Sequence, residues 1–293
     1  MAKLIVSHFH TVYSDGLLDP RKAFPDGILL PADHGTAFLS IVCHLEDPAR
    51  FPLIGAEIYV LNDTPRDAPR KGGGRTAFHL TAYAYSAKGL QNLFDLLSSP
   101  PRLGDLFSRS WEGLIVGTGC KGSPFHDRVR ENPAEFAELS RKFAERGGVL
   151  AFELFSYEHP APDAVPESFP LLFSTDLHLS PSLIADPDAK DVYATFLEAR
   201  PEKSSPLSPI KGGKRYAELM VKAWEFISEP EIPAWALKRM EWIEGFFPAG
   251  RLVDYTLPRF PDEEFERLCA RLMAECPEER RERLEAELAV IRE

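Results

Sequence analysis

The sequence predicts an α/β fold, a seven-stranded (β/α) barrel with a helical extension at its C-terminus. Seven short apolar runs recur along the chain, and amphipathic, helix-like segments lie between many of them. Alternating strands and helices are typical of a parallel sheet, and seven such units favour a barrel over an open sheet. A chain of 293 residues, 44% of them hydrophobic, is long enough for one large domain with an appendage.

Most of the seven runs are too short for helices and do not alternate cleanly, as expected of strands that are covered on both faces. They are Leu4–Val6, Ile28–Leu30, Leu53–Val60, Phe78–Ala84, Gly113–Val116, Val149–Phe155 and Pro170–Phe173.

Three helices are recognisable from an N-cap residue, which in two cases precedes a proline. They start at Asp19, at Ser86 before residues 87–97, and at Asn132, whose helix ends at the pair Gly147 and Gly148. Three later segments, 224–247, 262–276 and 277–291, place apolar residues at helical spacing. We expect the first to pack against the barrel and the other two to dock onto another surface.

Composition limits the classes of function. The formal net charge of −11 argues against a protein that grips nucleic acid through a broad basic face. The four cysteines form no CxxC pair, which fits a reducing compartment. The sequence has neither an 18-residue apolar run nor a basic N-terminus followed by an apolar stretch. We therefore expect a soluble, cytoplasmic protein.

The first apolar run ends in His8 and His10, and Asp15 follows in a Ser-Asp-Gly turn. Residues two apart on a strand share a face, so the two imidazoles are expected to point the same way. Imidazole nitrogens and carboxylate oxygens together suit zinc, manganese or iron. This pair of histidines alone is a weak signal.

The same residue types recur in or after the other strands, and the further candidates are Asp33, His34, Glu57, Cys120, His159, Asp176 and His178. In a barrel the carboxyl ends of the strands converge on one face, where active sites are built. Of the eight histidines in the chain, five fall at these positions. The joint pattern predicts a multinuclear metal site.

Asp33 and three further histidines are given other roles. Asp33 is expected to orient a histidine instead of binding metal itself. His79 begins its apolar run instead of ending it, which favours a structural or outer role. His44, on a polar helix face, and His126, in a loop, are interpreted as surface residues.

Four segments in combination resemble the PHP (polymerase and histidinol phosphatase) superfamily: HFHTVYSDG at 8–16, DHG at 33–35, GAE at 55–57 and DLH at 176–178. Further segments are similar to the N-terminal PHP domain of bacterial C-family polymerases, the DNA polymerase III alpha subunits of the replicative or error-prone branch. These segments are FHLT at 78–81, GLQNL at 89–93, GLIVGTGC at 113–120, LPRFP at 257–261 and RLEAELAVI at 283–291.

The chain departs from the polymerase pattern at three places. Its first motif is two residues shorter between Ser14 and Asp15, and His159 lies six residues after Glu153 where the family usually has four. The chain also stops where the polymerase palm would begin, so we expect that this polypeptide alone does not polymerise DNA.

The resemblance implies a distorted barrel over residues 1–255 and an extension over 256–293 that resembles the start of the palm region. It implies two or three divalent ions, zinc or manganese and as a further option iron, held by His8, His10, Asp15, His34, Glu57, Cys120, His159, Asp176 and His178. The implied activity is metal-dependent phosphodiester hydrolysis, a proofreading 3′–5′ exonuclease, with His159 and Asp176 as catalytic residues. The implied partners are a DNA 3′ end, the polymerase body and other replisome subunits.

Two alternatives stay open. The first alternative is a structural docking platform without catalysis. The second is a free-standing phosphatase that acts on a small phosphorylated metabolite. The ligand set argues against the first alternative, and the polymerase-like segments after residue 256 argue against the second. Two basic stretches, Arg66–Arg75 and Lys211–Arg215, are most simply loops, with contact to a substrate backbone as the sharper hypothesis.

Overall fold

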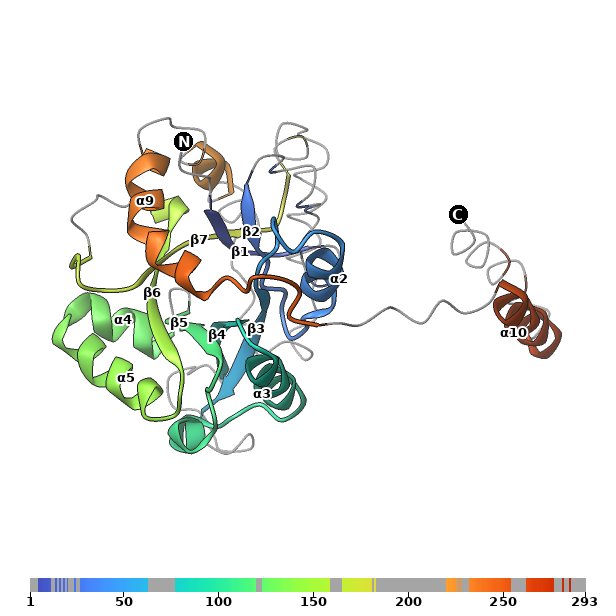
Figure 1. The fold of residues 1–293 in the computed structure, drawn as a ribbon, viewed down its shortest axis with the longest axis horizontal. Helices are drawn as coiled ribbons and strands as arrows, with labels where there is room; N and C mark the ends of the chain where they lie inside the picture. The colour runs from blue at the N-terminus through green and yellow to red at the C-terminus, as the bar shows by residue number, and fades with distance from the viewer. Residues whose placement is uncertain are drawn as a thin grey trace, which may run out of the picture. The chain divides into compact units, whose positions relative to one another are not determined.

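Seven strands form one sheet in the computed structural model (Figure 1), in the spatial order β2-β1-β7-β6-β5-β4-β3. The strands are β1 (Ile5–Phe9), β2 (Ile28–Leu30), β3 (Ile54–Leu61), β4 (Ala77–Ala84), β5 (Leu114–Gly117), β6 (Val149–Phe155) and β7 (Leu171–Leu177). Each one contains or overlaps a predicted apolar run, so the seven strands are confirmed.

The structure describes residues 5–11, 14, 16, 18, 20, 24, 27–62, 77–119, 123–158, 165–180, 182, 220–225, 227, 232–253, 262–276, 281 and 285. The chain divides into two compact units, residues 1–253 and 254–293. The sheet belongs to the first unit.

The expectation of a wholly parallel sheet is wrong at one strand. β4 runs antiparallel to both of its neighbours: its residue Thr81 lies opposite Glu57 of β3, and its residue Ala82 lies opposite Val116 of β5. The other neighbouring strands pair in parallel. Antiparallel neighbours need no helical crossover, and the stretch between β3 and β4 includes the segment Arg66–Arg75 predicted to be a loop. This reversal places the start of β4 beside the carboxyl ends of the parallel strands.

The sheet curls around a common interior. One hydrophobic cluster draws side chains from β1, β2, β4, β5, β6 and β7, among them Ile5, Leu30, Tyr83, Ile115, Ala151 and Leu172. Beyond the end of β2, an isolated bridge joins His34 to Glu57 on β3, with Gly35 N–H donating to the Glu57 carbonyl at 3.0 Å. The first and last strands of the sheet therefore meet at this point, which gives the barrel-like shape.

Helices cover the outside of the sheet (Figure 1). α2 (Phe38–Glu46) packs beside β3, α3 (Ala87–Ser98) beside β3 and β4, α5 (Ala134–Ala144) beside β6, and α9 (Ile232–Met240) beside β7. α4 (Pro124–Glu131) precedes α5, and among the described residues 3-10 helices span Leu103–Ser108, Ser156–Glu158 and Glu241–Phe246.

Two of the predicted helix starts are confirmed. Ser86 caps α3 by accepting the Gly89 N–H at 3.0 Å. Asn132 accepts the Ala134 N–H at the start of α5, which ends at Ala144, and the turn that follows contains Gly147, whose φ is 79°. Glycine adopts this left-handed conformation without a steric penalty. Asp19 lies outside the described residues.

The prediction that the tryptophan-rich segment packs onto the barrel is confirmed. Trp235 and Trp242 lie against the core, and the Trp242 indole N–H donates to the Leu171 carbonyl at 3.0 Å. Trp224 donates likewise to the Leu179 carbonyl at 2.9 Å.

The two histidines interpreted as surface residues are buried instead. His44 on α2 has no exposed surface, its Nδ1 lies 2.6 Å from the Phe51 carbonyl oxygen, and its Nε2 accepts the Leu252 N–H at 2.7 Å. His126 lies on α4, also without exposed surface, and stacks on Phe152. The side of each helix that carries its histidine packs against the rest of the unit. Polar and apolar residues alternate irregularly around both histidines, so the sequence does not show this burial.

The second unit contains α10 (Asp262–Glu275), in which Cys269 is 2% exposed. The predicted segment 277–291 and both basic stretches lie almost wholly or wholly outside the described residues. Within the described part of the chain, every helix is too short or too polar to cross a membrane.

Candidate metal centre

His8 and Asp176 have unusual backbones for ordinary residues. Their φ angles are 52° and 49°, in the left-handed region that favours glycine. The two residues lie where the register between β1 and β7 shifts, between the pairs Ser7–Ser174 and Phe9–Leu177. Such irregularities re-aim side chains beside functional sites. Here they turn an imidazole and a carboxylate toward each other.

Hydrogen bonds from neighbouring strands hold the His8 backbone in this conformation. Its N–H donates to the Tyr83 hydroxyl on β4 at 3.1 Å. Its carbonyl accepts from the Thr175 hydroxyl on β7 at 3.0 Å. Both polar groups of a buried, strained residue are therefore satisfied.

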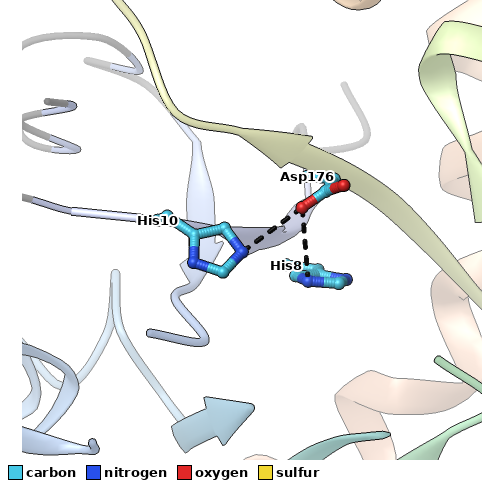
Figure 2. Close-up of side chains that lie close together, drawn as sticks. All are labelled: His8, His10 and Asp176. Atoms are coloured by element: carbon cyan, nitrogen blue, oxygen red, sulfur yellow. Dashed lines mark ion pairs between the residues drawn. The ribbon is translucent and has the colours of Figure 1, made fainter. Parts of the chain in front are cut away.

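A first cluster forms around Asp176, and Figure 2 shows three of its members. Asp176 Oδ1 lies 3.7 Å from His8 Nε2 and 3.3 Å from His10 Nε2. His178 Nε2 lies 3.4 Å from the same oxygen, and the His10 and His178 rings stack with centroids 4.1 Å apart. Three imidazole nitrogens thus converge on one carboxylate oxygen.

A second cluster contains His34, Glu57 and His79. Glu57 Oε2 lies 2.6 Å from His34 Nδ1 and 3.7 Å from His79 Nδ1. One ligand atom from each residue falls within 4.8 Å of the others, and the same holds for His8, His10 and Asp176 in the first cluster.

Glu57 joins the two clusters. Its Oε1 lies 3.0 Å from His8 Nε2, and its Oε2 lies 3.8 Å from His10 Nε2 as well as beside His34. The side chain is 5% exposed. One buried carboxylate therefore faces imidazoles of both clusters.

The pKa values follow from this dense packing. Burial lowers the pKa of His8, but the hydrogen bonds and charges of Glu153 and Glu57 outweigh burial and raise it to about 10. Burial and the neighbouring histidines lower the pKa of His79 to about 4, against the pull of Glu57. Burial opposes ionisation of Glu57 and Asp176, yet the surrounding histidines lower both carboxyl pKa values well below their usual range.

The structure therefore brings six of the nine predicted ligands together: His8, His10, His34, Glu57, Asp176 and His178. The other three, Asp15, Cys120 and His159, lie outside the described residues.

Sequence reasoning missed the placement of His79. It lies near the start of β4, and because β4 is antiparallel, that start lies at the edge where the other strands end. The loop-like stretch before this strand was the available signal, since it argues for a hairpin instead of a crossover.

Sequence reasoning also missed Glu153, which is fully buried on β6 and lies 3.0 Å from His8 Nδ1. No local motif marks it. The interpretation of Asp33 was wrong in detail, because its carboxylate accepts from Thr11 N–H at 2.6 Å, from Thr11 Oγ1 at 2.6 Å and from Ser14 Oγ at 2.8 Å. Asp33 therefore holds the loop after β1 instead of a histidine ring.

The donor set fits divalent metal ions. Five imidazoles and two carboxylates, all buried or largely buried, bring nitrogen and oxygen donor atoms together in two adjacent clusters. Such mixed nitrogen and oxygen donors suit zinc, manganese and iron. Around Asp176 Oδ1 the three imidazole nitrogens lie 3.3–3.7 Å away, farther than an ordinary hydrogen bond, which leaves room for a cation between the ligand atoms.

Comparisons with known proteins agree in part with the resemblance to DNA polymerase III alpha subunits. No family model matches the chain. The DNA polymerase III subunit alpha of Mycobacterium tuberculosis is 29% identical over 185 residues, covering 52% of this chain and 16% of that protein. The same subunit of Mycobacterium leprae is 30% identical over the same shares. The chain thus spans well under a fifth of the length of these relatives, and it is distantly similar to one part of DNA polymerase III alpha subunits.

Proposed function

We propose that this chain is a metal-dependent phosphodiesterase, the 3′–5′ exonuclease domain of a DNA polymerase III alpha-type protein. The observation that carries the proposal is the pair of adjacent clusters that share Glu57. Two ion sites a few ångströms apart are the arrangement that stabilises both oxygens in a phosphoryl displacement.

The residues divide between two sites. His8, His10, Asp176 and His178 would hold one ion, and His34, Glu57 and His79 would hold the other, with zinc or manganese as the expected metals. Ions bound there would act as Lewis acids toward phosphate and would lower the pKa of water. Asp15, Cys120 and His159 stay predicted as further ligands, and His159 as the acid that protonates the leaving oxygen.

The protein's own groups prepare the site for this chemistry. The lowered pKa of His79 keeps that imidazole neutral, with a lone pair available at neutral pH. The lowered pKa of Asp176 keeps it ionised. Asp176 and His34 retain 17% and 15% of their side-chain surface, more than the other ligands that the structure describes, so among these a phosphate group arriving from solvent would meet them first.

The proposed substrate is the 3′ end of DNA, and the proposed partners are the polymerase body and other replisome subunits. Similarity to DNA polymerase III alpha subunits over 52% of the chain supports this choice over a small phosphorylated metabolite. The helical segment after residue 253 would lead toward the polymerase body.

The test combines metal content with digestion of a 3′-labelled single-stranded oligonucleotide, with and without chelator. We expect two or three ions per chain and chelator-sensitive release of 3′ nucleotides. Asp176→Ala should abolish release, and Asp95→Ala, at an exposed position on α3, should not change it. Bound metal with intact DNA and hydrolysis of a small phosphomonoester would move the assignment to a metabolite phosphatase. Absence of bound metal and of both activities would leave a structural docking domain.

A further inference from the structure

The five imidazoles around Glu57 and Asp176 each turn one nitrogen toward these carboxylates; they are His8, His10, His34, His79 and His178. The partner of the other nitrogen fixes the ring orientation and the tautomer. For two rings the structure identifies a partner outside the ligand set. Glu153 contacts His8, and the Tyr59 hydroxyl contacts His34.

Glu153 is held rigidly for this role. Its Oε1 lies 3.0 Å from His8 Nδ1 and accepts from the Ser174 hydroxyl at 2.7 Å. Its Oε2 accepts from the Gly119 N–H at 2.5 Å. Glu153 and Ser174 have no exposed surface, so three donors from three parts of the chain fix a carboxylate that solvent does not reach.

Tyr59 is a different kind of partner. Its hydroxyl contacts His34 Nε2, on the side opposite the nitrogen that faces Glu57. Its ring also meets the His79 ring edge-on, with centroids 4.6 Å apart. Tyr59 is partly exposed and carries a neutral phenol, whereas Glu153 is buried and carries a carboxylate. The two clusters therefore differ in the charge of the group that contacts the far ring nitrogen of His8 in the first cluster and of His34 in the second.

We infer that Glu153 is the positioning residue that gives the His8–His10–Asp176 site a higher metal affinity than the His34–Glu57–His79 site. A carboxylate behind His8 holds the Nδ1–H tautomer, presents the Nε2 lone pair to the ion and makes the imidazole a stronger ligand. The neutral hydroxyl of Tyr59 orients His34 with less effect on its basicity. The first site therefore fills before the second. This inference rests on the metal centre proposed above but not on DNA as its substrate.

The test is a zinc titration of the full chain in competition with a chromophoric chelator. The wild-type protein should show at least two classes of site. Glu153→Gln should weaken the tight class about 10–100-fold and leave the weaker class unchanged. Tyr59→Phe should weaken only the weaker class. Glu138→Gln, at an exposed position on α5, is the matched control and should titrate like the wild type.

A second measurement needs no variant. Ring 15N spectra of the zinc-loaded wild-type protein should show His8 bound through Nε2 with its proton on Nδ1. Binding of His8 through Nδ1 would overturn the inference, as would equal weakening of both classes in Glu153→Gln that still unfolds cooperatively. Absence of zinc binding by the wild-type protein would instead refute the metal centre itself, so the two failures are distinguishable.

Discussion

His8 and Asp176 face each other from neighbouring strands with both backbones in the left-handed region, at φ angles of 52° and 49°. A residue other than glycine held in this conformation costs roughly 1–3 kcal/mol. The hydroxyls of Tyr83 and Thr175 offset part of that cost at His8. The geometry of the first cluster therefore depends on groups that do not belong to it.

Tyr83→Phe should lower both stability and metal affinity. Burial and the charge of Glu153 raise the pKa of Tyr83 well above its usual value, so its hydroxyl stays neutral and accepts the His8 N–H. Loss of this acceptor leaves a buried donor unpaired, which costs about 1–3 kcal/mol of unfolding free energy in urea titrations. Tyr85→Phe, at a partly exposed position, is the control. Equal stability of Tyr83→Phe and the wild type would show that the hydroxyl does not support His8.

Asp33→Asn should loosen the loop that follows β1. The carboxylate accepts three hydrogen bonds from Thr11 and Ser14, and an amide turns one acceptor into a donor that faces another donor. We expect a loss of about 1–3 kcal/mol in unfolding free energy. We also expect faster amide exchange at Thr11. Unchanged exchange at Thr11 would contradict this role.

Metal affinity at the first site should rise with pH. The His8 pKa of about 10 means that the metal-free imidazole carries a proton at neutral pH, and an ion must displace it. Apparent affinity should therefore increase about tenfold per unit between pH 7 and 9 and level off above the pKa. Calorimetry in buffers of different ionisation enthalpy should detect about one proton released on filling this site.

The second site offers an internal comparison. The pKa of His79 is lowered to about 4, so this histidine has no proton to release at neutral pH. Affinity that does not depend on pH at the first site would show that His8 is neutral before metal binds.

His44 should make the fold sensitive to mild acid. Burial lowers its pKa, repulsion from Arg251 acts in the same direction, and the Phe51 carbonyl only partly opposes them. The unfolded chain, with a pKa near 6.5, therefore takes up a proton that the folded chain resists. Unfolding free energy should fall as pH drops through 6.5 and level off below the folded pKa. In His44→Gln this part of the pH dependence should disappear, and an unchanged pH profile would refute the assignment.

Local patterns predicted the strands but not their directions. The apolar runs Ile28–Leu30 and Val149–Phe155 coincide with β2 and β6, because burial on both faces leaves an apolar signature in the sequence. The direction of β4 depends on the connection before it. Because β4 is reversed, His79 lies in the second cluster, whereas a parallel β4 would have placed it at the opposite edge of the sheet.

The candidate ligand residues were predictable from the sequence, whereas the residues that contact their far sides were not. His8, His10, Asp176 and His178 stand at strand ends in recognisable motifs. Glu153 lies 145 residues from His8 in the chain, and the pairing of β7 with both β1 and β6 brings the two residues together. No periodicity or motif encodes such a contact.

The bridge between His34 and Glu57 has a consequence for how the fold and the ions depend on each other. These residues both join the first and last strands of the sheet and face one another with ligand atoms 2.6 Å apart. Ions bound there would link the two edges of the sheet where they meet at His34 and Glu57. A ligand at one hundred times its dissociation constant adds about 2.7 kcal/mol to folding stability. Removal of the ions by a chelator should therefore separate these two edges first. Hydrogen exchange at the amides of Gly35 and Glu57 should become faster before exchange in the rest of the barrel changes.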